Sequence, residues 1–156
     1  QFVRYESCTT REGIRQELVR MQAEKFLTPR QAEAVDAEKI LALFSSELGN
    51  RILHADSLRR EFKFSILVPA ADYYPQAGAE EQVLLQGVVD CCFETLEGIT
   101  VVDFKTDRVD RRSVAARAEE YRPQLEAYAQ ALERVMEEKV CRKVLYFFST
   151  GATINL

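Results

Sequence analysis

The 156-residue chain lacks the features that would place it at a membrane. No apolar run approaches the ~20 residues that a membrane-spanning helix needs. Residues 1–5 do not open a basic segment followed by an apolar stretch, which is the pattern of a secretory signal. We therefore expect no membrane partner. Because the chain begins with Gln1 and not with Met, we interpret it as a piece of a longer protein.

Cysteine is scarce and is not spaced for metal binding. No two of the four cysteines (Cys8, Cys91, Cys92 and Cys141) have the C-x2-C spacing typical of zinc sites. Cys91 and Cys92 lie in an apolar, strand-like run, where a free thiol behaves as a small core residue. We expect reduced thiols, as in a bacterial cytoplasm, and no cofactor bound by cysteine.

An excess of positive charge is also missing. The chain has 21 Lys and Arg against 25 Asp and Glu, a formal net charge of −4, whereas nucleic-acid-binding modules are usually basic. Basic residues nevertheless gather after position 104. Two interpretations stay open for this run, a solvated loop and helix face or a contact to DNA. Its members are Lys105, Arg108, Arg111, Arg112, Arg117 and Arg122.

The periodicity of apolar residues predicts a helical first part followed by an α/β part. Helices are expected over 11–26, from Thr28, which opens a capping-box pattern with Gln31, and from near Asp36 to a stop at Gly49-Asn50. Strands are expected over 60–68, 83–94, 99–104 and 143–148, with a long helix over 113–138. We predict one α/β domain, residues 1–156, with a helical N-terminal part (1–57) and a mixed-sheet core (58–156).

Two aspartates interrupt strands that are otherwise apolar. Asp90 follows Val88-Val89, and Asp103 follows Val101-Val102. A buried carboxylate is costly unless it has a partner or a cation. A hairpin turn at Glu97-Gly98 can bring the two acids alongside, where they would raise each other's pKa. A divalent cation would remove that conflict, and oxygen ligands favour Mg²⁺, with Mn²⁺ as a substitute.

Lys105 and a helix downstream complete a pattern suited to phosphodiester hydrolysis. Lys105 lies two residues after Asp103, hence on the same face of the strand, and Phe104 between them can supply a carbonyl ligand. An ammonium group there can orient the attacking water and stabilise charge on a phosphate. Gln124 and Tyr128 share one face of the predicted long helix. The structural alternatives are an Asp103–Lys105 salt bridge and a core role for Tyr128.

These residues, in this order, resemble the RecB-like branch of the PD-(D/E)XK nuclease superfamily. The branch carries a G-x-x-D strand, here Gly87–Asp90, a D-x-K strand, here Asp103–Lys105, and a Q-x-x-x-Y helix, here Gln124–Tyr128. Within the branch, the chain is most similar to the C-terminal nuclease domain of AddA-type helicase-nuclease subunits. The resemblance implies a restriction-endonuclease-like fold, a mixed sheet flanked by helices.

The resemblance also implies roles for particular residues. Asp90, Asp103 and the Phe104 carbonyl would bind the metal, Lys105 would be the catalytic lysine, and Gln124 and Tyr128 would support the site. The DNA-contacting set would be Arg108, Arg111, Arg112 and Arg122. The implied partners are single strands from unwound DNA ends and a second, AddB-like subunit, in the repair of double-strand breaks by recombination.

Two features expected of the whole enzyme are missing from the sequence. No G-x-x-x-x-G-K-[ST] motif is present, so ATP would bind only in a motor domain outside these residues. The histidine ligand that RecB-like nucleases carry in a G-T-x-x-H setting is also missing, and His54 has the wrong context. We expect weak or no cutting by this piece if it begins after that motif. The alternatives are a silent domain of the same fold, which docks a partner or guides DNA, and an unrelated α/β binding module.

Overall fold

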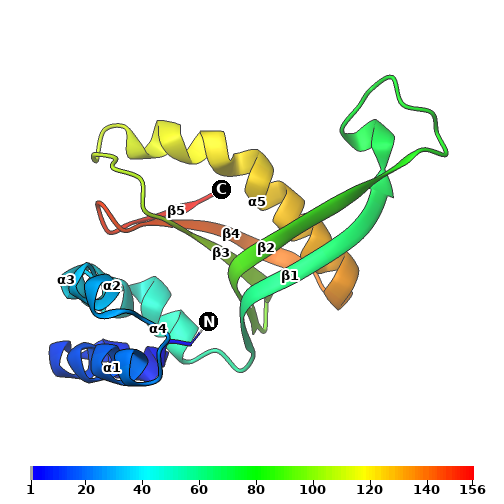
Figure 1. The fold of residues 1–156 in the computed structure, drawn as a ribbon. Coiled ribbons are helices and arrows are strands. Elements are labelled where there is room, and N and C mark those ends of the chain that lie inside the picture. Colours follow the sequence, from blue (N-terminus) through cyan, green and yellow to red (C-terminus); the bar gives the residue numbers. More distant parts are fainter. Residues whose placement is uncertain (1) are drawn as a thin grey trace.

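The computed structural model describes residues 2–156, and their first part is helical, as predicted (Figure 1). Each of the four α-helices begins at a side chain that accepts a hydrogen bond from a backbone amide of the first turn. At Thr28 the predicted capping box with Gln31 is formed. The elements are η1 (Tyr5–Thr9), α1 (Arg11–Ala23), α2 (Pro29–Glu33), α3 (Ala37–Phe44) and α4 (Glu47–Leu53).

The prediction that Gly49-Asn50 ends a helix is wrong. The helix from Asp36 ends at Phe44, and Ser46 then caps α4, which continues through Gly49. A Cβ at Gly49 would lie 2.1 Å from the Leu43 carbonyl oxygen. Glycine is therefore required here by the close approach of α3 and α4, and not by a helix stop.

The remaining residues form a five-stranded mixed sheet with strand order β1-β2-β3-β4-β5. Only the β3–β4 pair is parallel among these described strands, and the long helix makes the crossover between them. The last strand, which is only four residues long, was not predicted from the sequence. The elements are β1 (Leu58–Pro69), η2 (Ala70–Asp72), β2 (Gln82–Thr95), β3 (Gly98–Lys105), α5 (Val114–Met136), β4 (Val140–Phe147) and β5 (Ala152–Asn155).

Helices cover the sheet on both faces. In Figure 1, α5 lies above the sheet and the N-terminal helices lie below its left part, while the β1–β2 hairpin extends beyond both. Ile14, Phe44 and Ile52 pack on the lower face with Val102 of β3. On the upper face, α5 packs through Leu132 on Val101. This confirms the expected mixed sheet flanked by helices, with an N-terminal helical segment. No helix among residues 2–156 is long and apolar enough to cross a membrane.

The β1–β2 ladder has a kink at Glu61 and Asp90. Arg60 pairs with Cys91 and Phe62 with Val89, and between them Glu61 has a left-handed backbone with φ of 53°. Residues two apart on a strand normally lie on the same face of a sheet, but here they do not. Phe62 packs on the α5 side, whereas the Arg60 guanidinium lies over the Tyr5 ring on the other side. Such irregularities recur near active sites because they redirect a side chain. Asp90 lies opposite Glu61 at this irregularity.

Candidate active site

The structure brings the two strand-borne aspartates together at the start of the β2–β3 ladder. Cys91 pairs with Val102, so the same register continued by one residue places Asp90 opposite Asp103. The Asp90 carboxylate turns to the neighbouring strand, where Oδ2 accepts a hydrogen bond of 2.9 Å from the Phe104 amide. That amide precedes Lys105, so Asp90 also fixes the backbone between the other two members of the motif.

Asp103 is buried, and the close partner of its Oδ2 is the Lys105 ammonium group. Only 3% of the residue is exposed, and its Oδ2 has no partner in hydrogen-bonding geometry among the described residues. Burial is the main cause that raises the pKa of this carboxyl group. Asp90 raises it further, and Lys105 opposes both. A buried carboxylate beside a second one is the kind of group that a cation can satisfy.

Lys105 lies at the centre of the cluster. Its Nζ is 2.6 Å from Asp103 Oδ2, donates a hydrogen bond of 2.9 Å to Gln124 Oε1, and lies 3.8 Å from the centre of the Tyr121 ring. The salt bridge that the sequence offered as a structural alternative is therefore present. It occurs inside the predicted cluster and not at an isolated strand end.

Gln124 and Tyr128 of α5 join the cluster through one chain of contacts. Gln124 Nε2 donates to the Tyr128 hydroxyl at 2.7 Å. The Tyr128 ring meets Phe64 of β1 edge-on, with centroids 5.9 Å apart. Burial raises the pKa of Tyr128, so its hydroxyl stays protonated. The Tyr128 ring therefore packs in the core and its hydroxyl contacts Gln124, while its part in an active site stays a prediction.

Tyr121, Asp107 and Arg117 form an outer ring of contacts that was not predicted from the sequence. The Tyr121 hydroxyl donates to Asp107 Oδ2 at 2.7 Å, and Arg117 Nε donates to the same oxygen at 2.8 Å. The hydrogen bond from Tyr121 and then that from Arg117 lower the pKa of Asp107. One signal was present: Asp107 follows Lys105 by two residues, and Tyr121 precedes Gln124 by about one helical turn.

The donor set fits a divalent cation with oxygen ligands. Two carboxylates lie together, one of them with an unsatisfied buried oxygen, and the Phe104 backbone lies beside them. These two carboxylates are not joined by a third side-chain ligand: among residues 2–156, no group of three or more His, Cys, Asp or Glu side chains is placed to hold a metal ion. His54 does not join Asp90 and Asp103. It follows α4 and lines a hollow with Glu94 and Arg142 at the hairpin-turn end of the sheet. The Phe104 carbonyl as a third ligand stays a prediction.

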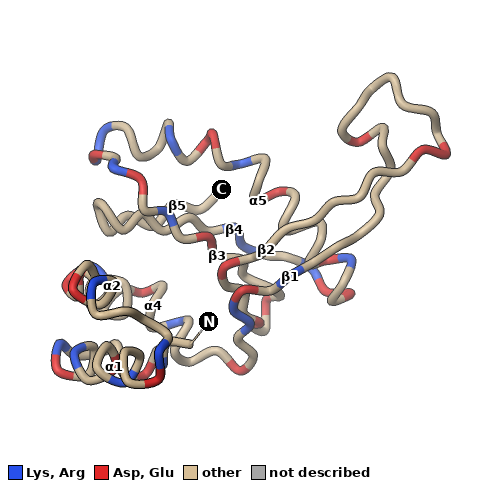
Figure 2. Tube along the Cα trace, viewed as in Figure 1, with Lys and Arg blue, Asp and Glu red and all other residues tan. Residues whose placement is uncertain are grey.

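The predicted DNA-contacting residues differ in their surroundings. Arg108, Arg111 and Arg112 are exposed on the segment between β3 and α5, and none of them makes an ion pair with a described residue. Figure 2 shows that acidic residues alternate with them along this segment. Arg122 instead pairs with Glu119 at 2.7 Å. The exposed three are therefore the members of the set that are free to meet a phosphate.

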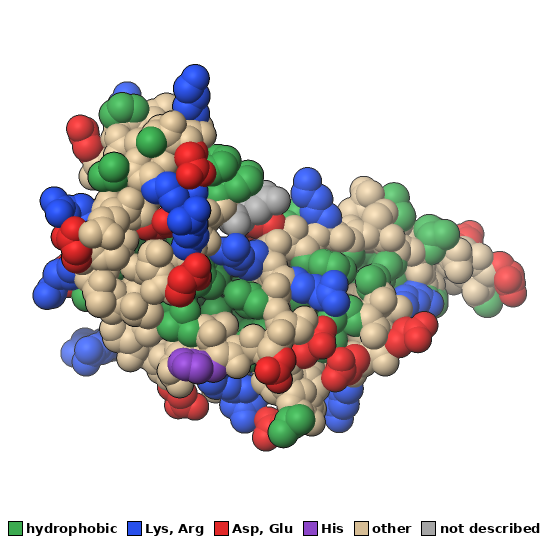
Figure 3. Space-filling model, turned by 90° about the horizontal axis from the view of Figure 1, so that it is seen from below, with side chains coloured by type: hydrophobic (Ala, Val, Ile, Leu, Met, Phe, Trp, Pro, Cys, Tyr) green, Lys and Arg blue, Asp and Glu red, His purple; other side chains and the backbone are tan. Residues whose placement is uncertain are grey.

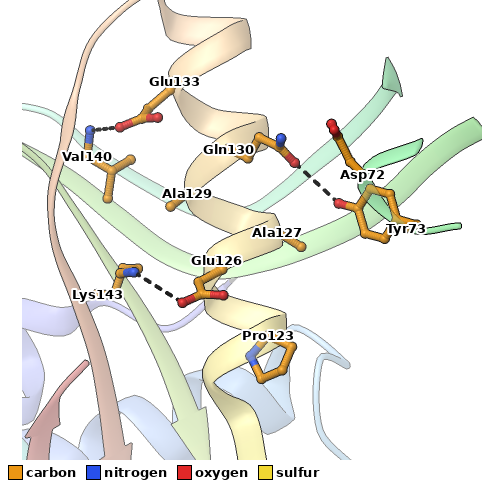
Figure 4. A pocket seen from close by; sticks show the side chains of 10 residues that line it. All are labelled: Asp72, Tyr73, Pro123, Glu126, Ala127, Ala129, Gln130, Glu133, Val140 and Lys143. Atoms are coloured by element: carbon orange, nitrogen blue, oxygen red, sulfur yellow. Dashed lines mark hydrogen bonds and ion pairs between the residues drawn. The ribbon is translucent and has the colours of Figure 1, made fainter. Parts of the chain in front are cut away.

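Two other surfaces of the molecule differ from this site. On the face seen in Figure 3, acidic and basic side chains are interspersed. A hollow of about 640 Å³ lies on the outer side of α5 and contains none of the predicted site residues (Figure 4). Its polar groups pair with each other, Tyr73 with Gln130 and Glu126 with Lys143. It therefore lacks the unsatisfied acid that marks the site at Asp103.

Comparison with known proteins agrees with this arrangement. Proteins named as ATP-dependent helicase/nuclease subunits of the A type are 41% identical over 143 residues in Desulforudis audaxviator, 42% over 149 in Acetivibrio thermocellus and 37% over 165 in Bacillus cytotoxicus. They match 90%, 93% and 100% of this chain, which spans only 12–13% of their length. The resemblance inferred from the motifs is thus confirmed. Since the model of the PD-(D/E)XK nuclease superfamily also matches residues 3–154, the chain belongs to that superfamily.

Proposed function

We propose that this chain is a DNA nuclease domain that hydrolyses phosphodiester bonds with Mg²⁺, or Mn²⁺ in its place, bound by Asp90 and Asp103. The observation that carries the proposal is the buried Asp103 carboxylate, which lies beside a second carboxylate and has the Lys105 ammonium group as the close partner of its Oδ2. Burial of two neighbouring carboxylates with one ammonium group between them is costly to a fold. Sites that are poorly satisfied in this way are typical of function.

The bound cation would supply Lewis acidity, which acidifies the attacking water and neutralises charge on the phosphate. Asp90 and Asp103 would hold it, and the Phe104 carbonyl would complete the protein's share of its ligands. Asp90 has a second task, because its bond from the Phe104 amide keeps that backbone in place. Lys105 would face the scissile phosphate and stabilise the charge that develops there.

The helix α5 would keep Lys105 oriented. Gln124 Oε1 accepts from Lys105 Nζ, and Gln124 is itself held by its bond to the Tyr128 hydroxyl. Each bond fixes the next side chain, as supporting contacts do in catalytic sites. We therefore assign Gln124 and Tyr128 to positioning of the lysine.

The substrate we propose is a single DNA strand that crosses the segment between β3 and α5. Arg108, Arg111 and Arg112 are exposed there, and the segment leads directly from Lys105 to the helix that carries Gln124. The similar proteins are named as ATP-dependent helicase/nuclease subunits. By that likeness, the domain would cut strands unwound by an ATP-driven motor during double-strand break repair, in the bacterial cytoplasm and with an AddB-like partner.

Cleavage of a 5′-labelled single-stranded oligonucleotide tests the proposal, and it is measured on the longer protein that carries this domain because the piece alone is expected to cut weakly or not at all. We expect cutting in Mg²⁺ or Mn²⁺, none in EDTA, and a loss of about 100-fold or more in Lys105→Ala, the range seen when a group that stabilises transition-state charge is removed. Lys63→Ala, an exposed lysine of β1, is the matched control and should cut normally. Binding of DNA and metal without any cutting would contradict the proposal and favour the silent domain.

A further inference from the structure

The ammonium group of Lys105 is enclosed by three different kinds of partner. A carboxylate oxygen of Asp103 lies 2.6 Å away, the amide oxygen of Gln124 lies 2.9 Å away, and the face of the Tyr121 ring lies 3.8 Å away. Only the first of these carries a formal charge. The Asp103 contact therefore dominates the electrostatic attraction as long as no cation is bound.

The same carboxylate is needed by the proposed metal. Asp103 Oδ2, which lies 2.6 Å from Lys105 Nζ, is also a buried oxygen of the carboxylate that the proposed cation would engage. A divalent cation held by Asp103 neutralises the charge that attracts the lysine and repels the ammonium group. When the site is filled, Lys105 must therefore be held by its other two partners.

Tyr121 is suited to hold Lys105, because several contacts fix the orientation of its ring. Its hydroxyl donates to Asp107 and accepts from Arg117 Nη2 at 3.0 Å. Its ring also packs near Phe147, with centroids 6.5 Å apart. A ring clamped in this way keeps its negative face toward the lysine, and a cation over such a face is attracted to it.

We propose that Tyr121 is a positioning residue: its ring retains the Lys105 ammonium group at the reaction centre when a cation engages Asp103. This inference rests on the proposed nuclease function. It assigns to Tyr121 a task that a structural tyrosine would not have, namely to replace an ion pair that metal loading removes. The Gln124 amide shares that task, and Tyr121 supplies the part that needs an aromatic face.

Chemical shifts of the lysine methylene next to the ammonium group test the contact itself. In the wild-type chain, labelled with ¹³C-lysine, the Lys105 signal should be shifted upfield by the Tyr121 ring, and Lys105→Arg identifies it by its loss. Mg²⁺ should leave the upfield shift in place. A Lys105 signal without that shift, or one that loses it when Mg²⁺ is added, would overturn the inference without any tyrosine variant.

Two variants separate the ring from the hydroxyl. Tyr121→Phe and Tyr121→Leu both lose the bonds to Asp107 and Arg117, but only Phe keeps the aromatic face. We expect Phe to retain the upfield shift and to cut within about 3-fold of wild type. Leu should lose the shift and about 10-fold in kcat with little change in KM, which corresponds to ~1.4 kcal/mol. Equal kcat in the two variants would contradict the proposal.

The outcomes also separate this inference from the proposed function. Wild-type chain that cuts DNA, together with a Leu variant of equal kcat, would refute the role of Tyr121 and leave the nuclease intact. Absence of cutting by the longer protein that carries this domain, together with a Lys105 signal that responds to Tyr121→Leu as described, would refute the nuclease and retain the contact. Tyr73→Leu serves as the control, because Tyr73 is exposed and lines the separate hollow beside α5. It should change neither the Lys105 chemical shift nor kcat.

Discussion

Asp90 and Asp103 form one pair of carboxylates, yet their surroundings differ. Asp90 is half-buried and accepts a hydrogen bond from a backbone amide. Asp103 is buried beside the Lys105 ammonium group, and burial is the first cause of its raised pKa. The fold therefore opposes the ionisation of Asp103. A cation would relieve this cost, because it adds positive charge beside two carboxylates that share the single ammonium group of Lys105.

Asp103→Asn should stabilise the metal-free chain at neutral pH. A carboxyl group whose pKa is higher in the folded state than in the unfolded state lowers stability once it ionises, and the loss is complete above the raised pKa. Asn avoids this loss. We expect a gain of ~1 kcal/mol, or a rise in Tm of roughly 2–4 °C for a domain of this size.

The advantage of Asn should shrink as the pH falls through the usual range of an aspartate, because Asp103 then becomes neutral in both states. Thermal melts in EDTA at several pH values measure this. If Asp103→Asn were less stable than wild type at pH 7, the ion pair with Lys105 would outweigh the cost of burial. Asp103 would then not be the unsatisfied carboxylate that the proposed cation site requires.

At the same scale, the sequence predicted which residues meet but not all of their neighbours. Asp103 and Lys105 are two apart on a strand, and Gln124 and Tyr128 are four apart on a helix, so local periodicity fixes each pair. Tyr121 could not be assigned in this way. Its contact with Lys105 depends on how α5 lies across β3, which is a tertiary property.

At the scale of elements, Gly87 links strand β2 to the helix that supports the lysine. A Cβ at this position would lie 2.7 Å from Phe64 Cζ and 3.2 Å from Tyr128 Cε1. Phe64 is paired across the strands with Gly87, and its ring occupies the space that a side chain there would need. The glycine of the G-x-x-D motif therefore lets Phe64 and Tyr128 pack together over β2.

Gly87→Ala should disturb both stability and cutting. Overpacking of this kind costs about 1–3 kcal/mol, and displacement of Tyr128 would loosen Gln124 and then Lys105. We expect a lower Tm in thermal melts and a kcat reduced by about 10-fold or more, since small misplacements at a catalytic site are costly. Gly78→Ala is the matched control, because its nearest neighbours lie 3.6 Å away. Equal behaviour of the two variants would show that Gly87 has no such role.

The elements that the sequence failed to predict share a physical reason. Three features were not predicted correctly: the continuation of α4 through Gly49, the strand β5 and the kink at Glu61. All three depend on contacts between elements. Gly49 is needed where α3 meets α4, and the four residues of β5 are ordered by pairing with β4. By contrast, the hairpin around Glu97-Gly98 and the capping box at Thr28 are local, and both predictions are confirmed.

At the scale of the whole molecule, charge is distributed so that a slightly acidic chain presents free arginines beside its site. The net charge is −4, yet Arg108, Arg111 and Arg112 lie on the segment that leads from Lys105 to α5. Other arginines in the described chain, such as Arg11, Arg15 and Arg20, are paired with glutamates. Local placement, and not the sum of charges, would therefore determine contact with DNA.

Reversal of Arg108, Arg111 and Arg112 to Glu should weaken binding of single-stranded DNA and flatten its salt dependence. Each phosphate contact contributes about 0.7 to the slope of log K against log salt, so three lost contacts lower it by roughly 2. Fluorescence anisotropy at several salt concentrations measures the slope. Reversal of Arg59, Lys139 and Arg142, at the hairpin-turn end, makes the same charge change as a control. An equal loss of slope in the control would show that Arg108, Arg111 and Arg112 are only solvated and do not contact DNA specifically.

The most direct test of a cation shared by Asp90 and Asp103 is calorimetric titration of the 156-residue chain with Mn²⁺. We predict one site, a dissociation constant raised at least about 10-fold in Asp90→Asn and in Asp103→Asn, and binding retained in Lys105→Ala, because the lysine is not a ligand. Wild-type affinity in both Asn variants, or no binding by the wild-type chain, would contradict the shared site.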